Sequence, residues 1–148
     1  MTIQWFPGHM AKALKTVQEK LKYVDIILEL RDARIPYSSS NPEIDGIIKK
    51  KHKLVLLNKA NMADDRKTNE WLSYYKDNNI TALAIDALTN FQINKIIPYA
   101  KIILQDKLNK EKLQGIKPRP IKALILGIPN VGKSTLINTL AKRKVKNQ

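Results

Sequence analysis

The chain has 148 residues, no cysteine and a formal net charge of +14 at pH 7. This length suits one compact domain, the lack of cysteine excludes a disulfide framework or a cysteine zinc site, and the charge favours a polyanionic partner. No apolar run reaches membrane-spanning length and the N-terminus has no apolar signal segment, so we expect a cytoplasmic protein with no membrane partner.

Strands and helices are predicted to alternate along the chain. Apolar runs predict strands over 24–30, 53–57, 80–85 and 123–126, and helical spacing or start signals predict helices over 9–22, from Pro42, over 65–78 and over 90–108. This alternation favours an α/β fold with a parallel sheet. We expect residues 1–22 to form a basic N-terminal helix or arm and residues 23–148 to form the remaining domain.

A phosphate-binding loop is the most specific motif, and it lies close to the C-terminus. The residues from Gly127 to Thr135 read GIPNVGKST and fit the pattern G-x-x-x-x-G-K-[ST]. Glycines let backbone N–H groups converge on a phosphate, Lys133 supplies a point charge, and the Ser134 hydroxyl can ligate magnesium. The apolar run before the loop and the helical spacing after it are the context that this motif requires.

Two further polar motifs follow predicted strands. The tetrapeptide Asn58-Lys59-Ala60-Asn61 ends the second strand and Asp86-Ala87 ends the third, as the phosphate loop ends the fourth. Taken singly, each is an ordinary polar turn. Ligands of open parallel sheets bind at the carboxyl ends of the strands, so the three motifs together predict a nucleotide site. In this site the tetrapeptide from Asn58 to Asn61 is the base-reading motif, and it comes before the phosphate loop in the chain.

The motifs in this order resemble the circularly permuted GTPases of the YlqF/YawG type, most closely the bacterial members. The segments Trp5-Phe6-Pro7-Gly8-His9-Met10 and Asp32-Ala33-Arg34-Ile35-Pro36 are similar to signatures of that family. The resemblance implies a permuted P-loop GTPase fold and a GTP-binding factor that assists assembly of the large (50S) ribosomal subunit. Its implied ligands are GTP or GDP with Mg²⁺, and its implied partners are large-subunit precursors and rRNA.

The resemblance also implies a role for individual residues. Asn58, Lys59, Ala60 and Asn61 would frame the guanine; Asp86 and Ala87 would present a backbone N–H to the base oxygen; and Asn130, Val131, Gly132, Lys133, Ser134 and Thr135 would wrap the phosphates, with Ser134 on Mg²⁺. His9 matches the histidine thought to replace the water-positioning glutamine of other GTPases. Without the resemblance, His9 reads as a surface histidine.

Two departures from the family pattern carry expectations. None of the five glycines has an aspartate three positions before it, so the Asp-x-x-Gly element is absent from this sequence. In the permuted order that element follows the phosphate-loop helix, so we expect an incomplete domain without its switch-bearing strands, a phosphate-loop strand left as an exposed apolar edge, and no hydrolysis by this chain alone.

The second departure is Asn61, which stands where the family has aspartate. Aspartate accepts both N1–H and the 2-amino group of guanine, whereas asparagine offers one acceptor and one donor. We therefore expect weaker GTP and GDP binding, a relative gain for xanthosine nucleotides, and recovery in Asn61→Asp.

Other functions stay open at this point. A non-hydrolysing rRNA- or ribosome-binding module with a relic nucleotide pocket explains the charge equally well. An ATPase is disfavoured by Asn58-Lys59. Each lysine-rich stretch, such as Lys49-Lys50-Lys51 or residues 142–146, taken alone, also reads as a solvated surface.

Overall fold

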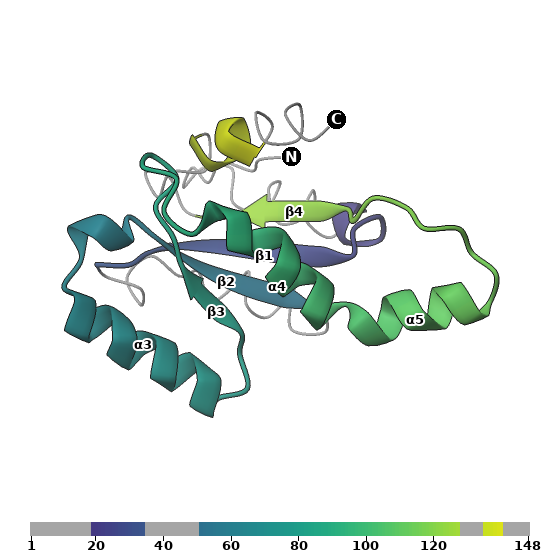
Figure 1. The fold of residues 1–148 in the computed structure, drawn as a ribbon, viewed down its shortest axis with the longest axis horizontal. Coiled ribbons are helices and arrows are strands. Elements are labelled where there is room, and N and C mark those ends of the chain that lie inside the picture. The colour runs from purple at the N-terminus through teal and green to yellow at the C-terminus, as the bar shows by residue number, and fades with distance from the viewer. Residues whose placement is uncertain (1–18, 35–50, 128–134, 141–148) are drawn as a thin grey trace.

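In the computed structural model the described residues are 19–34, 51–127 and 135–140. They contain the strands β1 (Ile26–Asp32), β2 (Lys53–Asn58), β3 (Ala82–Ala84) and β4 (Ala123–Leu126). These strands form one sheet in the order β3-β2-β1-β4, and every neighbouring pair is parallel (Figure 1). The α/β fold with a parallel sheet is therefore confirmed.

Helices connect the strands across both faces of the sheet. The 3-10 helix η2 (Ala60–Met62) and α3 (Asp65–Asp77) link β2 to β3, whereas η3 (Ile93–Lys95), α4 (Ile96–Ile103) and α5 (Gln105–Leu113) link β3 to β4. The side chain of Asp64 caps α3 by accepting a hydrogen bond from the Arg66 N–H at 2.9 Å. No helix among the described residues combines the length and the hydrophobicity needed to cross a membrane.

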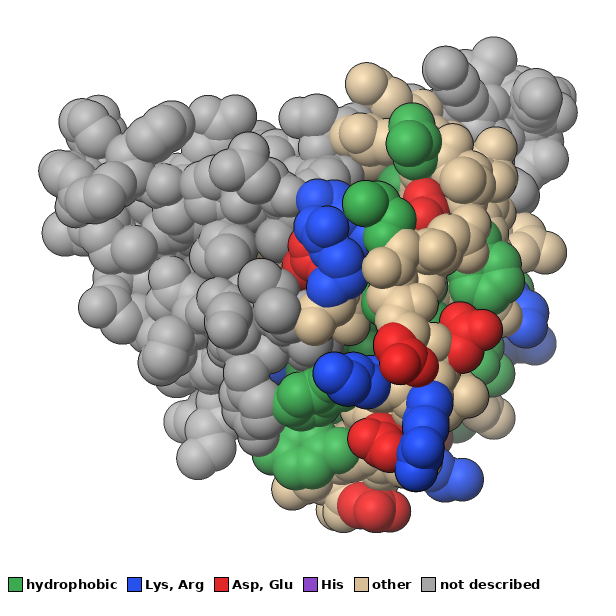
Figure 2. All heavy atoms as spheres, turned by 90° about the vertical axis from the view of Figure 1, so that its left-hand side faces the viewer, with side chains coloured by type: hydrophobic (Ala, Val, Ile, Leu, Met, Phe, Trp, Pro, Cys, Tyr) green, Lys and Arg blue, Asp and Glu red, His purple; other side chains and the backbone are tan. Residues whose placement is uncertain are grey.

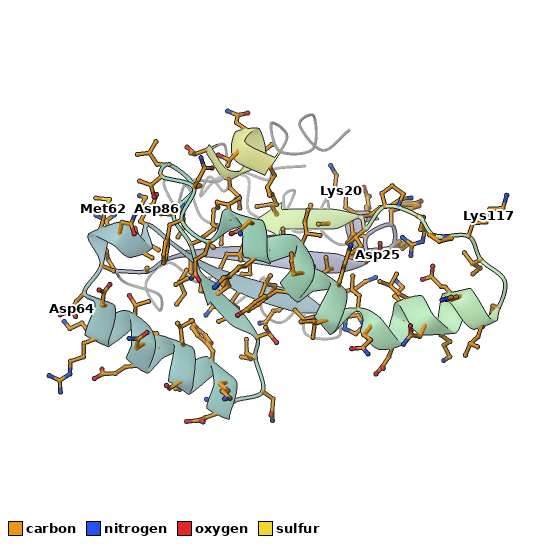
Figure 3. All side chains as sticks on the ribbon, viewed as in Figure 1. Lys20, Asp25, Met62, Asp64, Asp86 and Lys117 are labelled. Atoms are coloured by element: carbon orange, nitrogen blue, oxygen red, sulfur yellow. The ribbon has the colours of Figure 1, made fainter. Side chains whose placement is uncertain are left out.

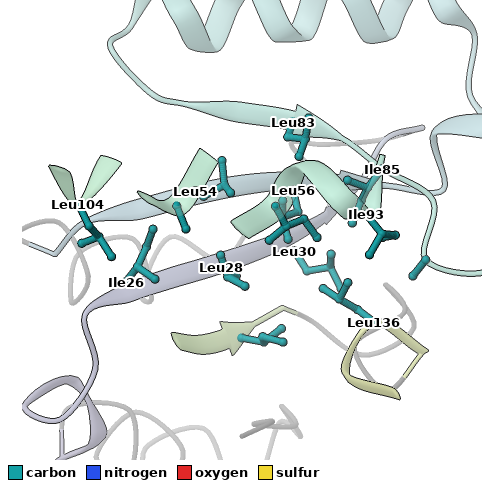
Figure 4. Packing of buried hydrophobic residues seen from close by; sticks show 14 residues of the cluster. Ile26, Leu28, Leu30, Leu54, Leu56, Leu83, Ile85, Ile93, Leu104 and Leu136 are labelled. Carbon is teal, nitrogen blue, oxygen red and sulfur yellow. The ribbon is translucent and has the colours of Figure 1, made fainter. Parts of the chain in front are cut away.

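The core consists of two apolar layers, one on each face of the sheet. Alternate residues of β2 enter opposite layers: Leu54 and Leu56 pack with α4, and Val55 and Leu57 pack with α3. Figure 4 shows the larger layer, in which residues of β1 and β2 meet Leu104 and Leu136. Because both faces are covered, the strands read as nearly continuous apolar runs.

The phosphate-loop strand β4 lies at one edge of the described sheet. Its hydrogen-bonded partner there is β1, with Ile26 opposite Ala123. Leu124, Ile125 and Leu126 are nevertheless buried, with at most 6% of their surface exposed. The position at the edge agrees with the sequence-based expectation, but the apolar side chains of β4 are covered.

The prediction of a single helix over 90–108 is wrong. The chain forms η3, α4 and α5 instead, and Leu104 between α4 and α5 leaves helical geometry with φ −91° and ψ 5°. Leu104 is fully buried, whereas α5 contains no buried residue. The helical run therefore breaks at its last fully buried residue, and α5, of which Leu108 packs partly against the core, projects beyond the sheet (Figure 1).

Other element boundaries also differ from the predictions. β1 begins at Ile26 and runs to Asp32, two residues past its predicted end, and β3 covers only Ala82–Ala84. Of the helix predicted over 9–22, residues 19–21 are described and helical, whereas Lys22 is described in a turn. Residues 9–18 and the helix predicted from Pro42 lie outside the described residues.

A charged pair is buried in the central strand β1. The Glu29 and Arg31 side chains are 5% and 7% exposed, and their closest N···O distance is 2.7 Å. Arg31 donates two hydrogen bonds to Glu29 Oε1 and one to the Tyr75 hydroxyl on α3. Lys53 Nζ lies 3.4 Å from Glu29 Oε2. The pair ties β1 to β2 and to α3.

An ionic anchor, formed by Asp25 with Arg119 and Lys107, holds the end of the sheet at which β1 and β4 begin. Asp25, just before β1, accepts hydrogen bonds from both terminal nitrogens of Arg119 and from Lys107 Nζ, at 2.7–2.8 Å. The backbone N–H of Lys122 also donates to it, at 2.9 Å. The Arg119 guanidinium, above all, holds the pKa of Asp25 well below its usual range. The anchor fixes the connector that leads into β4.

The face that carries α3 mixes charges of both signs. Figure 2 shows acidic and basic side chains interspersed over it, and Arg66 and Glu70 form an exposed i,i+4 pair there. A polyanion would find no single-sign patch on the described part of this face.

Candidate functional site

The predicted motifs come together at the edge of the sheet that the carboxyl ends of its strands form. β2 ends at Asn58, Asp86 and Ala87 follow β3, and Gly127 follows β4. All strands are parallel, so these ends lie on the same side. In Figure 3, Met62 and Asp86 lie at this side and Asp25 lies at the opposite one.

Asn58 joins the loop after β2 to the loop after β3. Its side chain is buried, and its Oδ1 accepts a hydrogen bond of 3.0 Å from the Ala87 N–H. Two residues later, the Ala60 N–H donates to the Ile85 carbonyl, also at 3.0 Å. The Ala87 N–H, which the resemblance assigns to the base oxygen, is thus engaged by Asn58 in this structure, and its contact with a base stays a prediction.

Asp86 shapes the loop that follows β3. Its Oδ1 accepts hydrogen bonds from the Leu88 N–H at 3.0 Å and the Thr89 N–H at 3.2 Å, and its own N–H donates to the Phe91 carbonyl at 3.0 Å. This local folding is typical of aspartate in turns. It leaves the Leu88 side chain 83% exposed at the sheet edge.

Asn61 lies on the exposed surface of η2 and reaches the same loop. Its Nδ2 donates a hydrogen bond of 2.8 Å to the Thr89 Oγ1. Nothing in the sequence indicates this contact, because a threonine in a polar loop carries no specific signal. Thr89 is therefore a residue that sequence reasoning missed.

Lys59 has a left-handed backbone and faces the end of β1. Its φ is 63°, an uncommon value for a lysine and one that recurs at ligand-binding turns. Its Nζ lies 3.7 Å from the Asp32 Oδ2. Hydrogen bonds from Arg34, and the charge of Lys59, hold the pKa of the Asp32 carboxyl below its usual value. Asp32 is thus a charged neighbour of the predicted base-reading motif as well as part of a sequence signature.

The helix after the phosphate loop touches the loop after β3. The Thr139 Oγ1 lies 2.8 Å from the Thr135 carbonyl oxygen and 3.1 Å from the Ala87 carbonyl oxygen. One turn earlier, Leu136 is fully buried in the larger core layer. Thr139 is a second contact residue that the sequence did not indicate.

Part of the predicted site falls outside the described residues. This holds for His9 and for Asn130, Val131, Gly132, Lys133 and Ser134, whereas Gly127 is described and buried and Thr135 is described at the start of the helix. Because Ser134, the predicted Mg²⁺ ligand, is one of these residues outside the described ranges, its fit to a metal ion stays a prediction. Within the described ranges, no three His, Asp or Glu side chains are grouped so as to hold a metal ion.

A family model described as "50S ribosome-binding GTPase" matches residues 122–148. Over 98% of its length the chain is 58% identical to ribosome biogenesis GTPase A of Priestia megaterium and 55% identical to that of Bacillus pumilus. It is 32% identical, over 97% of its length, to mitochondrial ribosome-associated GTPase 1 of Mus musculus.

Among solved structures, the chain resembles GNP-bound YlqF from T. maritima, with a TM-score of 0.63 and 30% identity over 87% of this chain and 47% of that one. GDP-bound YlqF gives a TM-score of 0.62 at 29% identity, over 86% of this chain and 48% of that one. The chain spans 51% of each of the two bacterial relatives and 43% of the mouse protein.

Proposed function

This chain belongs to the YlqF-type circularly permuted GTPases, and from that membership we propose that it supplies the nucleotide-binding half of a GTPase acting in assembly of the large ribosomal subunit. The observation that carries the proposal is the hydrogen bond from the Ala87 N–H to Asn58. It joins the two loops that we assign to the base, at the same end of the sheet as Gly127. A site held in this way loses little conformational entropy on binding.

In the proposed complex the base lies between the loop after β2 and the loop after β3. Asn58, Lys59, Ala60 and Asn61 frame it, and Asp86 and Ala87 hold the second loop, where the Ala87 N–H is shared between Asn58 and the base oxygen. The exposed Leu88 side chain offers apolar surface beside this site.

The phosphates are assigned to Asn130, Val131, Gly132, Lys133, Ser134 and Thr135. The motif supports this assignment because its N–H groups and Lys133 provide the positive field that phosphates require. Mg²⁺, held by Ser134, would neutralise charge on the outer phosphates. This assignment rests on residue types and on the buried strand β4 that precedes the loop.

Turnover by this chain alone is expected to be negligible. Phosphoryl transfer depends on positioned charge around the third phosphate, and the sequence lacks an Asp-x-x-Gly element to contact it. His9, proposed to orient the attacking water, does not replace that element. Equilibrium binding of GDP and GTP followed by single-turnover hydrolysis, with and without ribosomal particles, tests this expectation. Turnover equal to that of a chain carrying an Asp-x-x-Gly element, at equal saturation, would contradict it.

The same measurements separate the alternatives. Specific GDP binding with competition by GTP but not by ATP supports the GTPase. Binding to ribosomal particles without nucleotide binding supports a non-hydrolysing module with a relic pocket.

We further propose that residues 1–22 act as a basic arm toward rRNA and residues 23–148 as a partial G domain. The net charge of +14 supports a phosphate-rich partner. Lysines contact phosphates without reading bases, so the logarithm of affinity should fall linearly with the logarithm of salt concentration, with a slope of about −0.7 to −0.9 per phosphate contacted.

The arm is tested by matched charge reversals. Lys20→Glu/Lys22→Glu is expected to weaken binding to large-subunit precursors and to flatten the salt dependence. Lys67→Glu/Lys76→Glu, on the mixed-charge face of α3, is expected to change both much less. An affinity that does not respond to salt, or equal losses in the two variants, would contradict the proposed arm.

A further inference from the structure

We propose that Thr89 is a specificity-determining positioning residue, which holds the Asn61 amide so that its oxygen, not its nitrogen, is available to the base. The proposal rests on the proposed guanine-nucleotide site. Its observation is the hydrogen bond of 2.8 Å from Asn61 Nδ2 to Thr89 Oγ1, between residues 28 positions apart in the chain.

The loop geometry fixes where the threonine hydroxyl lies. Asp86 accepts the backbone N–H of Thr89 at 3.2 Å and that of Leu88 at 3.0 Å. Asn61, in turn, follows Ala60, whose N–H is bonded to the Ile85 carbonyl. Both partners of the Asn61–Thr89 bond are thus attached to the ends of β2 and β3, so the bond orients the amide relative to the site.

The orientation matters because an asparagine amide is asymmetric. It has one carbonyl acceptor and one NH₂ donor on opposite sides of the same carbon. With the NH₂ directed to Thr89, Oδ1 points the other way and can accept the N1–H that guanine and xanthine share. The two bases differ at position 2, where guanine carries an amino donor and xanthine a carbonyl acceptor.

A free Asn61 NH₂ would oppose the amino group of guanine and bond the carbonyl of xanthine. Because Thr89 accepts a hydrogen bond from that NH₂, it weakens both the repulsion of guanine and the hydrogen bond to xanthine. The chain therefore retains guanine nucleotides despite Asn61, and the gain for xanthosine nucleotides expected from the sequence becomes smaller. Residue 89 sets how far the substitution at residue 61 changes base choice.

The test is competition between GDP and xanthosine diphosphate on Thr89→Val and Thr89→Ser. Valine has the shape of threonine without the hydroxyl, so the affinity ratio should shift toward xanthosine diphosphate by roughly 2- to 12-fold, the range for one net hydrogen bond. Serine keeps the hydroxyl and should leave the ratio near that of the unmodified chain. Thr81→Val, at an exposed threonine before β3, is the matched control and should change nothing.

The Asn61→Asp background provides the decisive comparison. A carboxylate has no NH₂ to release, so Thr89→Val should not shift the ratio toward xanthosine diphosphate there. If GDP binds but Thr89→Val leaves the ratio unchanged in the Asn61 chain, or shifts it equally in both backgrounds, the role of Thr89 is refuted and the proposed function stands. If neither nucleotide binds any variant, the proposed function itself fails.

Discussion

Replacing Arg31 with leucine is expected to lower the free energy of unfolding by about 3–5 kcal/mol. The substitution removes the two hydrogen bonds that Arg31 donates to Glu29 and the one it donates to Tyr75. Glu29 then keeps a charge in a side chain that is only 5% exposed, with Lys53 Nζ 3.4 Å from its Oε2. A buried carboxylate that loses its main partner is costly because water cannot replace the lost bonds.

Urea unfolding at neutral pH measures this effect, and two variants control it. Glu29→Leu/Arg31→Leu removes both charges and should recover much of the lost stability, since apolar residues often substitute well for a buried ion pair. Arg66→Leu removes an arginine that is 89% exposed and should cost about 0.5 kcal/mol or less. An Arg31→Leu variant within about 1 kcal/mol of the unmodified chain would show that the pair contributes little.

The same pair explains why the end of β1 was not predicted. Glu29, Arg31 and Asp32 are polar, and an apolar run in the sequence stops at Leu30. In the structure, each of these three residues is buried because it finds a partner of opposite charge. Such pairing depends on which strands and helices become neighbours, and a linear pattern does not contain that information.

The sequence pattern also did not predict where the helix expected over 90–108 would break. The run 90–108 has helical spacing, but spacing does not reveal where the sheet ends. Leu104 is the last fully buried residue of that run, and α5, which is mostly polar and contains no buried residue, extends past it. Conversely, β4 was predicted with its observed bounds because a short apolar run before a phosphate loop has few alternative structures.

For the candidate site, the sequence predicted which motifs meet but not how they touch. Each motif follows a strand, and parallel strands bring their ends to one edge, so the convergence followed from pattern alone. The contacts Asn58–Ala87 and Asn61–Thr89 depend on the register of β2 against β3, where Leu57 pairs with Ala84. Shifting that register by one residue would separate both pairs.

The contact between Asn58 and Ala87 leads to the largest expected effect on nucleotide binding. Asn58→Ala removes the acceptor of the Ala87 N–H, and Ala87 is only 3% exposed. An unpaired buried donor costs about 1–3 kcal/mol, so the free chain should avoid this cost by opening the loop after β3. GDP must then re-form the loop when it binds, and we expect its affinity to fall by up to roughly 5- to 150-fold. Direct contacts between Asn58 and the base would add to this loss.

Titration with GDP measures the affinity, and hydrogen exchange over residues 86–91 tests the cause. The Ala87 amide should exchange faster in Asn58→Ala than in the unmodified chain, because its acceptor is gone. Asn109→Ala, at an exposed asparagine of α5 remote from this edge of the sheet, is the matched control and should leave both measurements unchanged. Faster exchange without a loss of affinity would mean that Asn58 holds the loop but that the loop does not hold the base. Unchanged exchange together with a large loss of affinity would instead assign the effect to direct contact between Asn58 and the nucleotide.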